Sequence, residues 1–294
     1  MLCGQLNELG LSASADVEAW KSRIRLPALY NRWLEHSLRE LQARGMELGE
    51  VAPTSELWPQ WDAYLSNAKN DRQLRAQADL LDATLRALPA ILRGELPATQ
   101  VMFPNGSMAL VEGIYKHNKL ADYFNEVLAQ TLLNYIETRL RQDPAARFRI
   151  IEIGAGTGGT SSLLFDRLQP YAAHMAEYSY TDISKAFLLH AQERYAAKAP
   201  YLTTTLFNVE QPLQAQGIEL GVYDVVIATN VLHATQEIRR TLRNAKATLK
   251  GHGLLLLNEI TSTNLFTQLT FGLLEGWWRY VDVYAAHQRT VGIV

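Results

Sequence analysis

Short strand-like runs alternate with helical stretches from Arg149 onward, and this alternation limits the possible folds more than any other feature of the sequence. The expected strands are rich in aliphatic and β-branched residues, and they cover 149–153, 177–182, 203–208, 223–229 and 253–259. Helical stretches lie between them at 157–168, 184–197 and 235–250. Strands that are joined by crossover helices pair in parallel, and the unbroken apolar run at 225–227 suits a sheet buried on both faces. The sequence therefore predicts an α/β fold in which helices cover both faces of a parallel sheet.

The first 140 residues show helical periodicity instead. Between Leu26 and Gly45 large apolar residues recur three and four positions apart, Pro27 suits the first helical turn, and Gly45 suits a C-terminal cap. Similar apolar stripes run through 74–88 and 120–135. We therefore expect an all-helical N-terminal subdomain over residues 1–142 and an α/β core over residues 143–294.

Charge and cysteine content exclude several classes of protein. The chain has 28 Lys and Arg against 30 Asp and Glu, which argues against a nucleic-acid binder that neutralises phosphates. The single Cys3 excludes a disulfide framework within the chain, and the seven histidines show no metal-ligand spacing. Residues 1–10 do not resemble a signal peptide, and the aliphatic block at 254–257 is too short to cross a bilayer. We expect a cytoplasmic protein with no metal, no nucleic-acid partner and no membrane span.

A glycine-rich loop follows the first expected strand, in the sequence Ile151-Glu-Ile-Gly-Ala-Gly-Thr-Gly-Gly159. Glycines let the backbone approach a ligand closely, and the helix that follows offers unpaired N–H groups at its start. The spacing of Gly154, Gly156 and Gly159 also satisfies a dinucleotide-binding pattern. The loop therefore predicts a nucleotide-like ligand without naming it.

Acidic residues near the loop favour one ligand over another. Asp182 ends the second expected strand, where a carboxylate can accept hydrogen bonds from ribose hydroxyls. Glu152 precedes the first glycine by two residues, where it would repel a phosphate but suits a cationic amino-acid group. Asn208 and Val209 end the third strand, where they can meet an adenine amine and an adenine face. An NAD-dependent oxidoreductase would explain Asp182 but not Glu152, whereas S-adenosylmethionine would explain both.

Three stretches carry a resemblance to a known family. Residues 152–158 read Glu-x-Gly-x-Gly-x-Gly, residues 223–235 read Tyr-Asp-Val-Val-Ile-Ala-Thr-Asn-Val-Leu-His-Ala-Thr, and residues 269–278 read Leu-Thr-Phe-Gly-Leu-Leu-Glu-Gly-Trp-Trp. Together they resemble the class I S-adenosylmethionine-dependent methyltransferase domains that are embedded in modular polyketide synthases.

The resemblance implies a Rossmann-like methyltransferase core under a helical lid. S-adenosylmethionine would be the methyl donor, S-adenosylhomocysteine the product, and an acyl carrier protein beside neighbouring polyketide synthase domains would present the substrate. The residues expected to bind the cofactor are Glu152, Gly154, Gly156, Gly158, Asp182, Asn208, Val209 and Asn230.

The family also implies a catalytic dyad of His233 and Glu259. Both residues fall at the C-terminal ends of neighbouring expected strands, where open α/β sheets build their sites. Histidine can accept a proton near neutral pH, and a carboxylate can orient it and stabilise the imidazolium. We therefore expect His233 to act as the base and Glu259 to hold it.

Residues 115–125 depart from the pattern of carbon-methylating members. Tyr115 and Asn125 match and are the candidates on the substrate side, but the expected Pro and Arg are missing and Asp122 stands in the Arg position. A carboxylate there would repel an enolate oxygen. We therefore expect methylation of a β-hydroxyl or enol oxygen, with methylation of the α-carbon of a β-ketoacyl carrier protein as the alternative.

Two features leave further alternatives open. The family has a final antiparallel strand pair, whereas only residues 289–294 could form an additional strand here. A non-catalytic methyltransferase-like scaffold domain is a further alternative, although the intact dyad and glycine loop argue against it.

Overall fold

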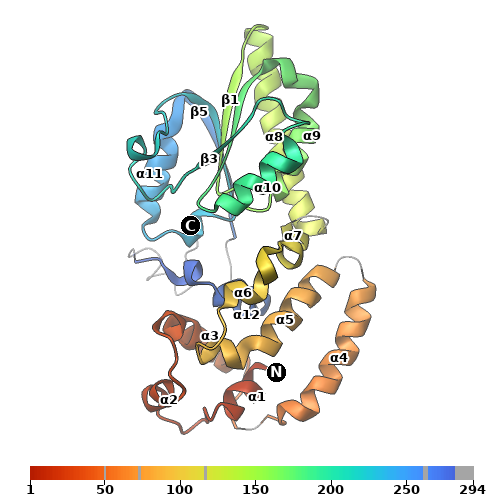
Figure 1. The fold of residues 1–294 in the computed structure, drawn as a ribbon, viewed down its shortest axis with the longest axis vertical. Helices are drawn as coiled ribbons and strands as arrows, with labels where there is room; N and C mark the ends of the chain where they lie inside the picture. Colours follow the sequence, from red (N-terminus) through yellow and green to blue (C-terminus); the bar gives the residue numbers. More distant parts are fainter. Residues whose placement is uncertain (50, 72–73, 116–117, 261–263, 282–294) are drawn as a thin grey trace. The chain divides into compact units, whose positions relative to one another are not determined.

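A computed structural model describes residues 1–49, 51–71, 74–115, 118–260 and 264–281 of the chain. They form two compact units (Figure 1). The helical unit contains Met1–Ile114 and the described residues of Thr263–Trp278, and the sheet unit contains Tyr115–Ser262 and the residues from Arg279 onward. The sequence-based boundary at 142/143 differs from this division, because the preceding long helix packs with the sheet unit.

The helical unit is built around large buried side chains. Trp20, Trp33, Leu34, Leu80 and Ile91 are each at most 1% exposed. Burial of such aromatic and aliphatic groups is the main force that holds short helices together. The α-helices of the unit are α1 (Leu2–Glu8), α2 (Val17–Ile24), α3 (Asn31–Ala43), α4 (Thr54–Asn70), α5 (Arg75–Leu92), α6 (Ala98–Met102), α7 (Ala109–Tyr115) and α12 (Leu265–Leu269).

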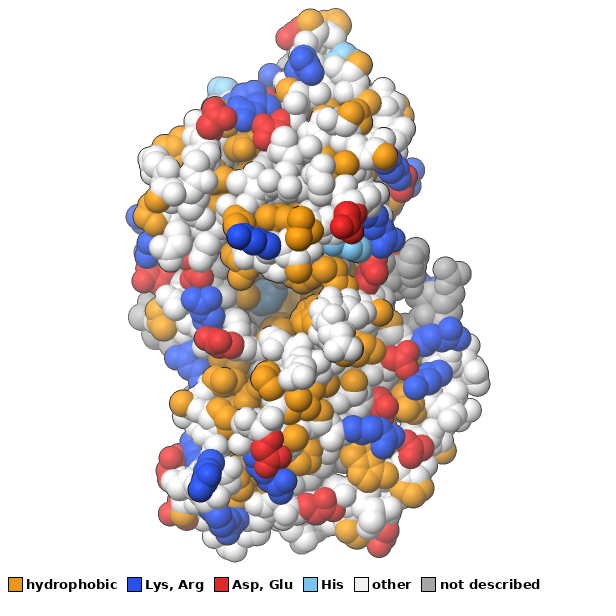
Figure 2. Space-filling model, viewed as in Figure 1, with side chains coloured by type: hydrophobic (Ala, Val, Ile, Leu, Met, Phe, Trp, Pro, Cys, Tyr) orange, Lys and Arg blue, Asp and Glu red, His pale blue; other side chains and the backbone are white. Residues whose placement is uncertain are grey.

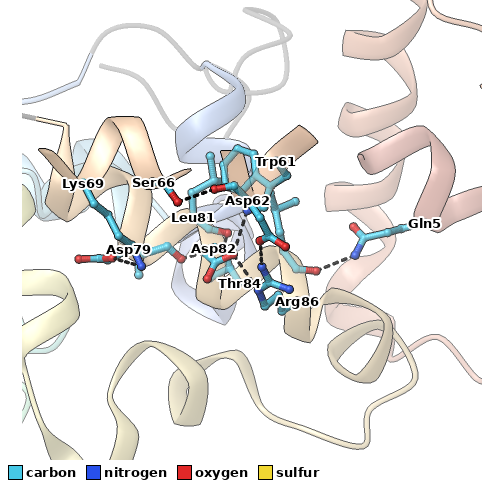
Figure 3. A network of polar contacts seen from close by, with 12 residues as sticks. Gln5, Trp61, Asp62, Ser66, Lys69, Asp79, Leu81, Asp82, Thr84 and Arg86 are labelled. Carbon is cyan, nitrogen blue, oxygen red and sulfur yellow. Dashed lines mark hydrogen bonds and ion pairs between the residues drawn. The ribbon is translucent and has the colours of Figure 1, made fainter. Parts of the chain in front are cut away.

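Polar contacts join α4 to α5 (Figure 3). The indole Nε1 of Trp61 donates to Asp82 at 2.8 Å, and Arg86 pairs with both Asp82 and Asp62. These groups are partly exposed, so solvent screens them and each pair contributes at most about 1 kcal/mol. The contacts fix the register of two helices that already pack through apolar side chains such as Leu65.

The chain returns to the helical unit after the last strand. Trp33 on α3 donates its indole N–H to the backbone oxygen of Gln268 at 2.8 Å. Gln268 in turn donates Nε2 to the backbone oxygen of Trp33 at 3.0 Å and to Ser37 Oγ at 2.7 Å. Because these polar groups are buried, losing one partner would orphan the other. The segment 264–278 is therefore part of the helical unit.

The sheet unit contains five parallel strands in the order β3-β2-β1-β4-β5 (Figure 1). The crossover order and the parallel pairing confirm the predicted α/β methyltransferase fold. The strands begin and end within four residues of the predicted positions: β1 (Phe148–Ile153), β2 (Met175–Asp182), β3 (Leu202–Leu206), β4 (Tyr223–Thr229) and β5 (Leu249–Asn258).

Two apolar cores lie on the two faces of this sheet. One contains side chains of α8 (Lys119–Gln142), α9 (Gly159–Leu168) and α10 (Lys185–Tyr195) against alternate residues such as Ile150 and Val225. The other contains side chains of α11 (Ile238–Thr248) against Ile151 and Val226. Neighbouring residues of β1 and β4 therefore face opposite cores, which explains why the strands read as unbroken apolar runs.

Positive and negative side chains are mixed on the surface of the described residues. Lys and Arg are interspersed with Asp and Glu over the face shown in Figure 2. No described helix combines the length and the apolar character needed to cross a bilayer. The described residues also contain no group of three His, Cys, Asp or Glu side chains that could hold a metal ion. The possible strand at 289–294 lies outside the described residues.

Candidate functional site

The glycine loop lies between β1 and α9, at the carboxyl end of the sheet. Gly154, Gly156 and Gly158 have φ values of +61°, +58° and +73°, a region that side chains other than glycine rarely adopt. A Cβ atom on Gly154 would collide with Val231, and one on Gly158 would lie 2.8 Å from the hydroxyl of Tyr195. The loop is therefore a tight cradle that only glycines can form.

Gly156 differs from its neighbours because a Cβ there would meet only the backbone oxygen of Gly154, at 3.9 Å. The position of a Cβ on Gly156 therefore faces open space, and its backbone is hydrogen-bonded to two residues of β2. The Gly156 N–H donates to Asp182 Oδ2 at 3.0 Å, and its carbonyl accepts from the hydroxyl of Tyr180 at 2.7 Å. The apex of the loop is thus fixed while its open side leaves room for a ligand.

Asp182 is 6% exposed and also accepts from the Ser184 N–H, at 2.8 Å. Burial raises the pKa of this carboxyl above its usual range, although hydrogen bonds from the backbone N–H groups of Ser184, Gly156 and Ile183 oppose the shift. Each carboxylate oxygen can still accept further hydrogen bonds. The residue is therefore suited to ribose hydroxyls, as the sequence predicted.

Glu152 is almost completely buried beneath the loop. Its Oε2 accepts from Ser161 Oγ at 2.5 Å and from the hydroxyl of Tyr178 at 2.6 Å. Burial raises the pKa of Glu152 to about 7. Within the described part of the chain, neither Glu152 nor Asp182 forms a salt bridge. Two buried carboxylates beside an open glycine cradle fit a ligand that combines a cation with sugar hydroxyls, which is the chemistry of S-adenosylmethionine.

The other predicted cofactor residues lie at the carboxyl ends of β3 and β4. Asn208 Oδ1 accepts from the Glu210 N–H at 3.0 Å, and Val209 is 5% exposed. Asn230 has a φ of +51° and donates its N–H to the carbonyl of Asn258 at 2.8 Å. The structure thus gives each of these residues a structural contact, and their contacts to a cofactor stay a prediction.

His233 and Glu259 meet across the ends of β4 and β5. His233 Nδ1 lies 2.7 Å from Glu259 Oε2, and both side chains are less than a tenth exposed. The second oxygen, Oε1, accepts from the N–H groups of Val231 and Leu232 at 3.0 and 2.8 Å. Glu259 therefore orients the imidazole and also fixes the backbone that carries it. With Nδ1 directed at Glu259, Nε2 is the ring nitrogen that would take a proton from a substrate.

Tyr115 and Asn125 have different environments. Burial and the nearby carboxylate of Glu259 raise the pKa of Tyr115, so its phenol stays neutral and able to donate. Asn125 is 5% exposed, and its amide bridges the carbonyl of Tyr115 at 3.5 Å and the hydroxyl of Thr160 at 2.9 Å. Tyr115 thus lies near the dyad, whereas Asn125 ties α8 to the start of α9.

Asp122 does not occupy the position that the sequence interpretation required. It is exposed in the first turn of α8, where the positive end of the helix dipole favours a carboxylate. Its exposure removes the support that a carboxylate buried beside the substrate would have given to an oxygen acceptor.

Sequence reasoning missed the residues that hold the predicted site in place. Tyr178 and Tyr180 were missed: they alternate along β2 with the predicted Asp182, and Tyr178 donates to Glu152 while Tyr180 donates to the carbonyl of Gly156. The signal was present, since residues two apart on a strand share a face. Ser161 had no such signal, because its contact with Glu152 depends on how α9 packs.

Comparisons with known proteins agree with this site. A family model described as "Methyltransferase domain" matches residues 151–255. The polyketide synthases PksR and PksM of Bacillus subtilis (strain 168) are 49% and 50% identical to the chain over 96% of its length. The chain spans only 11% and 7% of the lengths of these two synthases.

Solved structures give the same answer at the level of the fold. The DszA carbon methyltransferase is 31% identical with a TM-score of 0.89, and the match covers 100% of this chain and 77% of that one. The CurJ carbon methyltransferase is 29% identical with a TM-score of 0.87, and the match covers 100% of this chain and 78% of that one. The chain therefore belongs to the S-adenosylmethionine-dependent methyltransferase domains of polyketide synthases.

Proposed function

We propose that this chain methylates the α-carbon of a β-ketoacyl thioester carried by an acyl carrier protein. The observation that carries the proposal is its likeness, over the whole chain, to the DszA and CurJ carbon methyltransferases. The sequence favoured an oxygen acceptor because of Asp122, and the exposure of Asp122 on α8 removes that reason. The alternative drawn from the sequence is thus better supported than its main interpretation.

The cofactor site is proposed to use the groups around the glycine loop. S-adenosylmethionine supplies an electrophilic methyl group when it is bound. Glu152 would face the ammonium group of the cofactor, and Asp182 would accept hydrogen bonds from its ribose hydroxyls. The open side of Gly156 would leave room for the part of the cofactor that passes closest to the loop. Asn208 and Val209 would border the adenine, and Asn230 would complete the wall at the end of β4.

His233 is proposed to be the base. Its Nε2 would take the α-proton, which two flanking carbonyls make acidic, while Glu259 stabilises the imidazolium through Nδ1. A carbon–carbon bond then forms as the carbon–sulfur bond of the donor breaks, and the proton remains on His233. The neutral phenol of Tyr115 could donate to the enolate oxygen, which would replace the missing arginine as a stabilising group.

The partners are proposed from the relatives. Because they are polyketide synthases many times longer than this chain, a carrier protein and adjoining synthase domains would present the substrate. The sequence assigned control of access to residues 1–142; because α8 packs in the core of the sheet unit, that role is proposed only for the helical unit. A cytoplasmic location also stays a prediction.

The test is to offer the protein β-ketoacyl and β-hydroxyacyl carrier proteins side by side, with a donor whose methyl group is deuterated. We expect the label on the α-carbon of the keto substrate, located by mass-spectrometric fragmentation. A label on oxygen would restore the first interpretation. No label on either substrate, despite measured cofactor binding, would favour a non-catalytic scaffold.

A further inference from the structure

The carboxylate of Glu152 is held by hydroxyl groups from two different elements. Ser161 on α9 and Tyr178 on β2 both donate to the same oxygen, Oε2, at 2.5 and 2.6 Å. Ser161 and Tyr178 are at most 2% exposed, and Tyr178 is further fixed by an edge-to-face contact between its ring and that of Phe165, with centroids 4.8 Å apart. Two donors on one oxygen suit an ionised carboxylate, because a charged acceptor makes the stronger hydrogen bonds.

The charged groups around Glu152 do not neutralise it. From β2 it faces Tyr178, Tyr180 and the carboxylate of Asp182, and from α9 it faces only the hydroxyl of Ser161. Among the described residues no Lys, Arg or His pairs with it. A second carboxylate and a low-dielectric setting therefore disfavour its charge, and the two hydroxyls alone favour it.

We propose that Ser161 and Tyr178 are positioning residues that keep Glu152 ready to ionise, so that binding of the cofactor's ammonium group drives a proton off this carboxyl. The proposal rests on the proposed function, since it needs S-adenosylmethionine as the ligand. Burial and the nearby carboxylate of Asp182 raise the pKa of Glu152 to about 7 in the protein without its ligand, while the hydrogen bonds from Ser161 and Tyr178 oppose that rise. A cation at hydrogen-bonding distance favours the ionised form of Glu152. It supplies the positive charge that no described Lys, Arg or His side chain provides there.

The sign of the pH dependence follows from linkage. If the ligand-bound state holds fewer protons than the ligand-free state, affinity rises with pH until Glu152 is ionised in both. For a carboxyl that titrates near pH 7 when free and well below pH 6 when bound, the dissociation constant should fall about fivefold between pH 6 and pH 7. Above that range the ligand's own α-amino group, with a pKa of about 7.7–8.0, begins to lose the charge that Glu152 would bind. Binding at pH 7 should release about half a proton.

The hydroxyl groups of Ser161 and Tyr178 allow a more specific prediction. Both favour the ionised carboxyl, so their removal must raise the pKa of Glu152 in the free protein. In Tyr178→Phe and Ser161→Ala the midpoint of the affinity curve should therefore move to higher pH by about one unit. Phenylalanine keeps the ring that packs on Phe165, so this variant tests the hydroxyl and not the core.

The experiment is isothermal titration of S-adenosylmethionine into the protein from pH 6 to pH 8, in buffers of different ionisation enthalpy. Glu152→Gln should bind more weakly and lose the protein's share of the proton release and of the pH dependence. Glu193→Gln, which changes an exposed carboxylate on α10, should behave as the wild type. Methylthioadenosine, which has no ammonium group, should bind with no proton release.

The outcomes separate this inference from the proposed function. Proton release that persists in Glu152→Gln, or a wild-type affinity that does not change with pH, would overturn the linkage while leaving the methyltransferase assignment intact. Failure of the wild type to bind S-adenosylmethionine at any pH would overturn both. If Tyr178→Phe does not fold, the pH midpoint of Ser161→Ala and the number of protons that the wild type releases on binding still test the proposal.

Discussion

At the scale of single residues, the site combines positions that only one residue type can fill with positions whose role depends on their partner. Gly154 and Gly158 are fixed by positive φ and by the atoms a Cβ would strike. Gly156 is fixed by positive φ alone, and its open side is where a ligand would approach. His233 and Glu259 instead owe their roles to each other, through the 2.7 Å contact between Nδ1 and Oε2.

Gly156→Val should weaken cofactor binding at least tenfold in calorimetry. The β-branched side chain is strained at a φ of +58°, by about 1–2 kcal/mol, and it would fill the open side of the loop. Gly45→Val is the matched control, because Gly45 has a φ of +68° with nothing within 4 Å and lies in the helical unit. Equal affinities for the two variants would contradict the assigned cradle.

His233→Ala should reduce methyl transfer by about 10²–10⁴-fold while leaving cofactor affinity close to that of the wild type, because a positioned base contributes on that scale. Glu259→Gln should slow the reaction less, since His233 would remain present but less well oriented. His252→Ala, near the opposite end of β5, should keep full activity. The measurement is the single-turnover rate of methyl transfer to a carrier-bound substrate. A His233→Ala variant that keeps its activity would contradict a catalytic role for His233 and Glu259.

At the scale of elements, β2 and α8 each perform two tasks. Alternate residues of β2 brace the cofactor loop, while the same strand pairs with β1 and β3. One face of α8 packs on the sheet through Leu128, Leu132 and Ile136, and its first turn begins just after Tyr115. The start of α8 therefore decides how firmly the segment carrying Tyr115 is held.

Asn118→Ala should lower the free energy of unfolding by about 1 kcal/mol. The side chain of Asn118 caps α8 by accepting from the N–H groups of Leu120 and Ala121 at 3.1 and 3.3 Å. Asn134→Ala, in the exposed middle of the same helix, should be neutral or slightly stabilising, because alanine has the higher helix propensity. Denaturant titration measures the free energy of unfolding of both variants. Equal decreases in the two variants would show that the Asn118 cap does not stabilise α8.

At the scale of the whole molecule, neither compact unit is one continuous stretch of sequence. The helical unit takes in residues 264–278 after β5 is complete, and Gln268 fastens them to α3. The sheet unit meanwhile buries the carboxyls of Glu152 and Asp182, neither of which forms a salt bridge with another described residue. Such uncompensated charges lower stability and are typical of sites that await a ligand.

Glu152→Gln should raise the free energy of unfolding at pH 8, by up to about 3 kcal/mol, with no gain near pH 4. The pKa of Glu152 is raised in the folded protein, from 4.5 to about 7, so the folded state binds more protons than the unfolded state across this window. Wild-type stability therefore falls as pH rises from 4.5 to 7, and the amide removes that loss. Denaturant midpoints at several pH values measure it, and a destabilised variant at pH 8 would refute the expectation.

The sequence by itself determined the parallel sheet and the glycine loop, because each depends on local order along the chain, whereas the pairing of His233 with Glu259 was expected from the resemblance to a known family. Alternating strands and helices force parallel pairing, positive φ requires glycine, and strand ends meet at one edge of a sheet. The positions of β4, Gly154 and Gly156 could therefore be predicted from the sequence pattern alone.

Only the tertiary structure decided what surrounds those residues. The contacts of Ser161 and Tyr178 with Glu152, the exposure of Asp122, and the return of residues 264–278 to the helical unit all join parts of the chain that the sequence does not relate. The physical reason is that burial and side-chain hydrogen bonding depend on which surfaces pack together, and packing is set by the three-dimensional fit of whole elements. The acceptor preference drawn from Asp122 lost its support for that reason, since a charge acts on a site only if the fold brings it there.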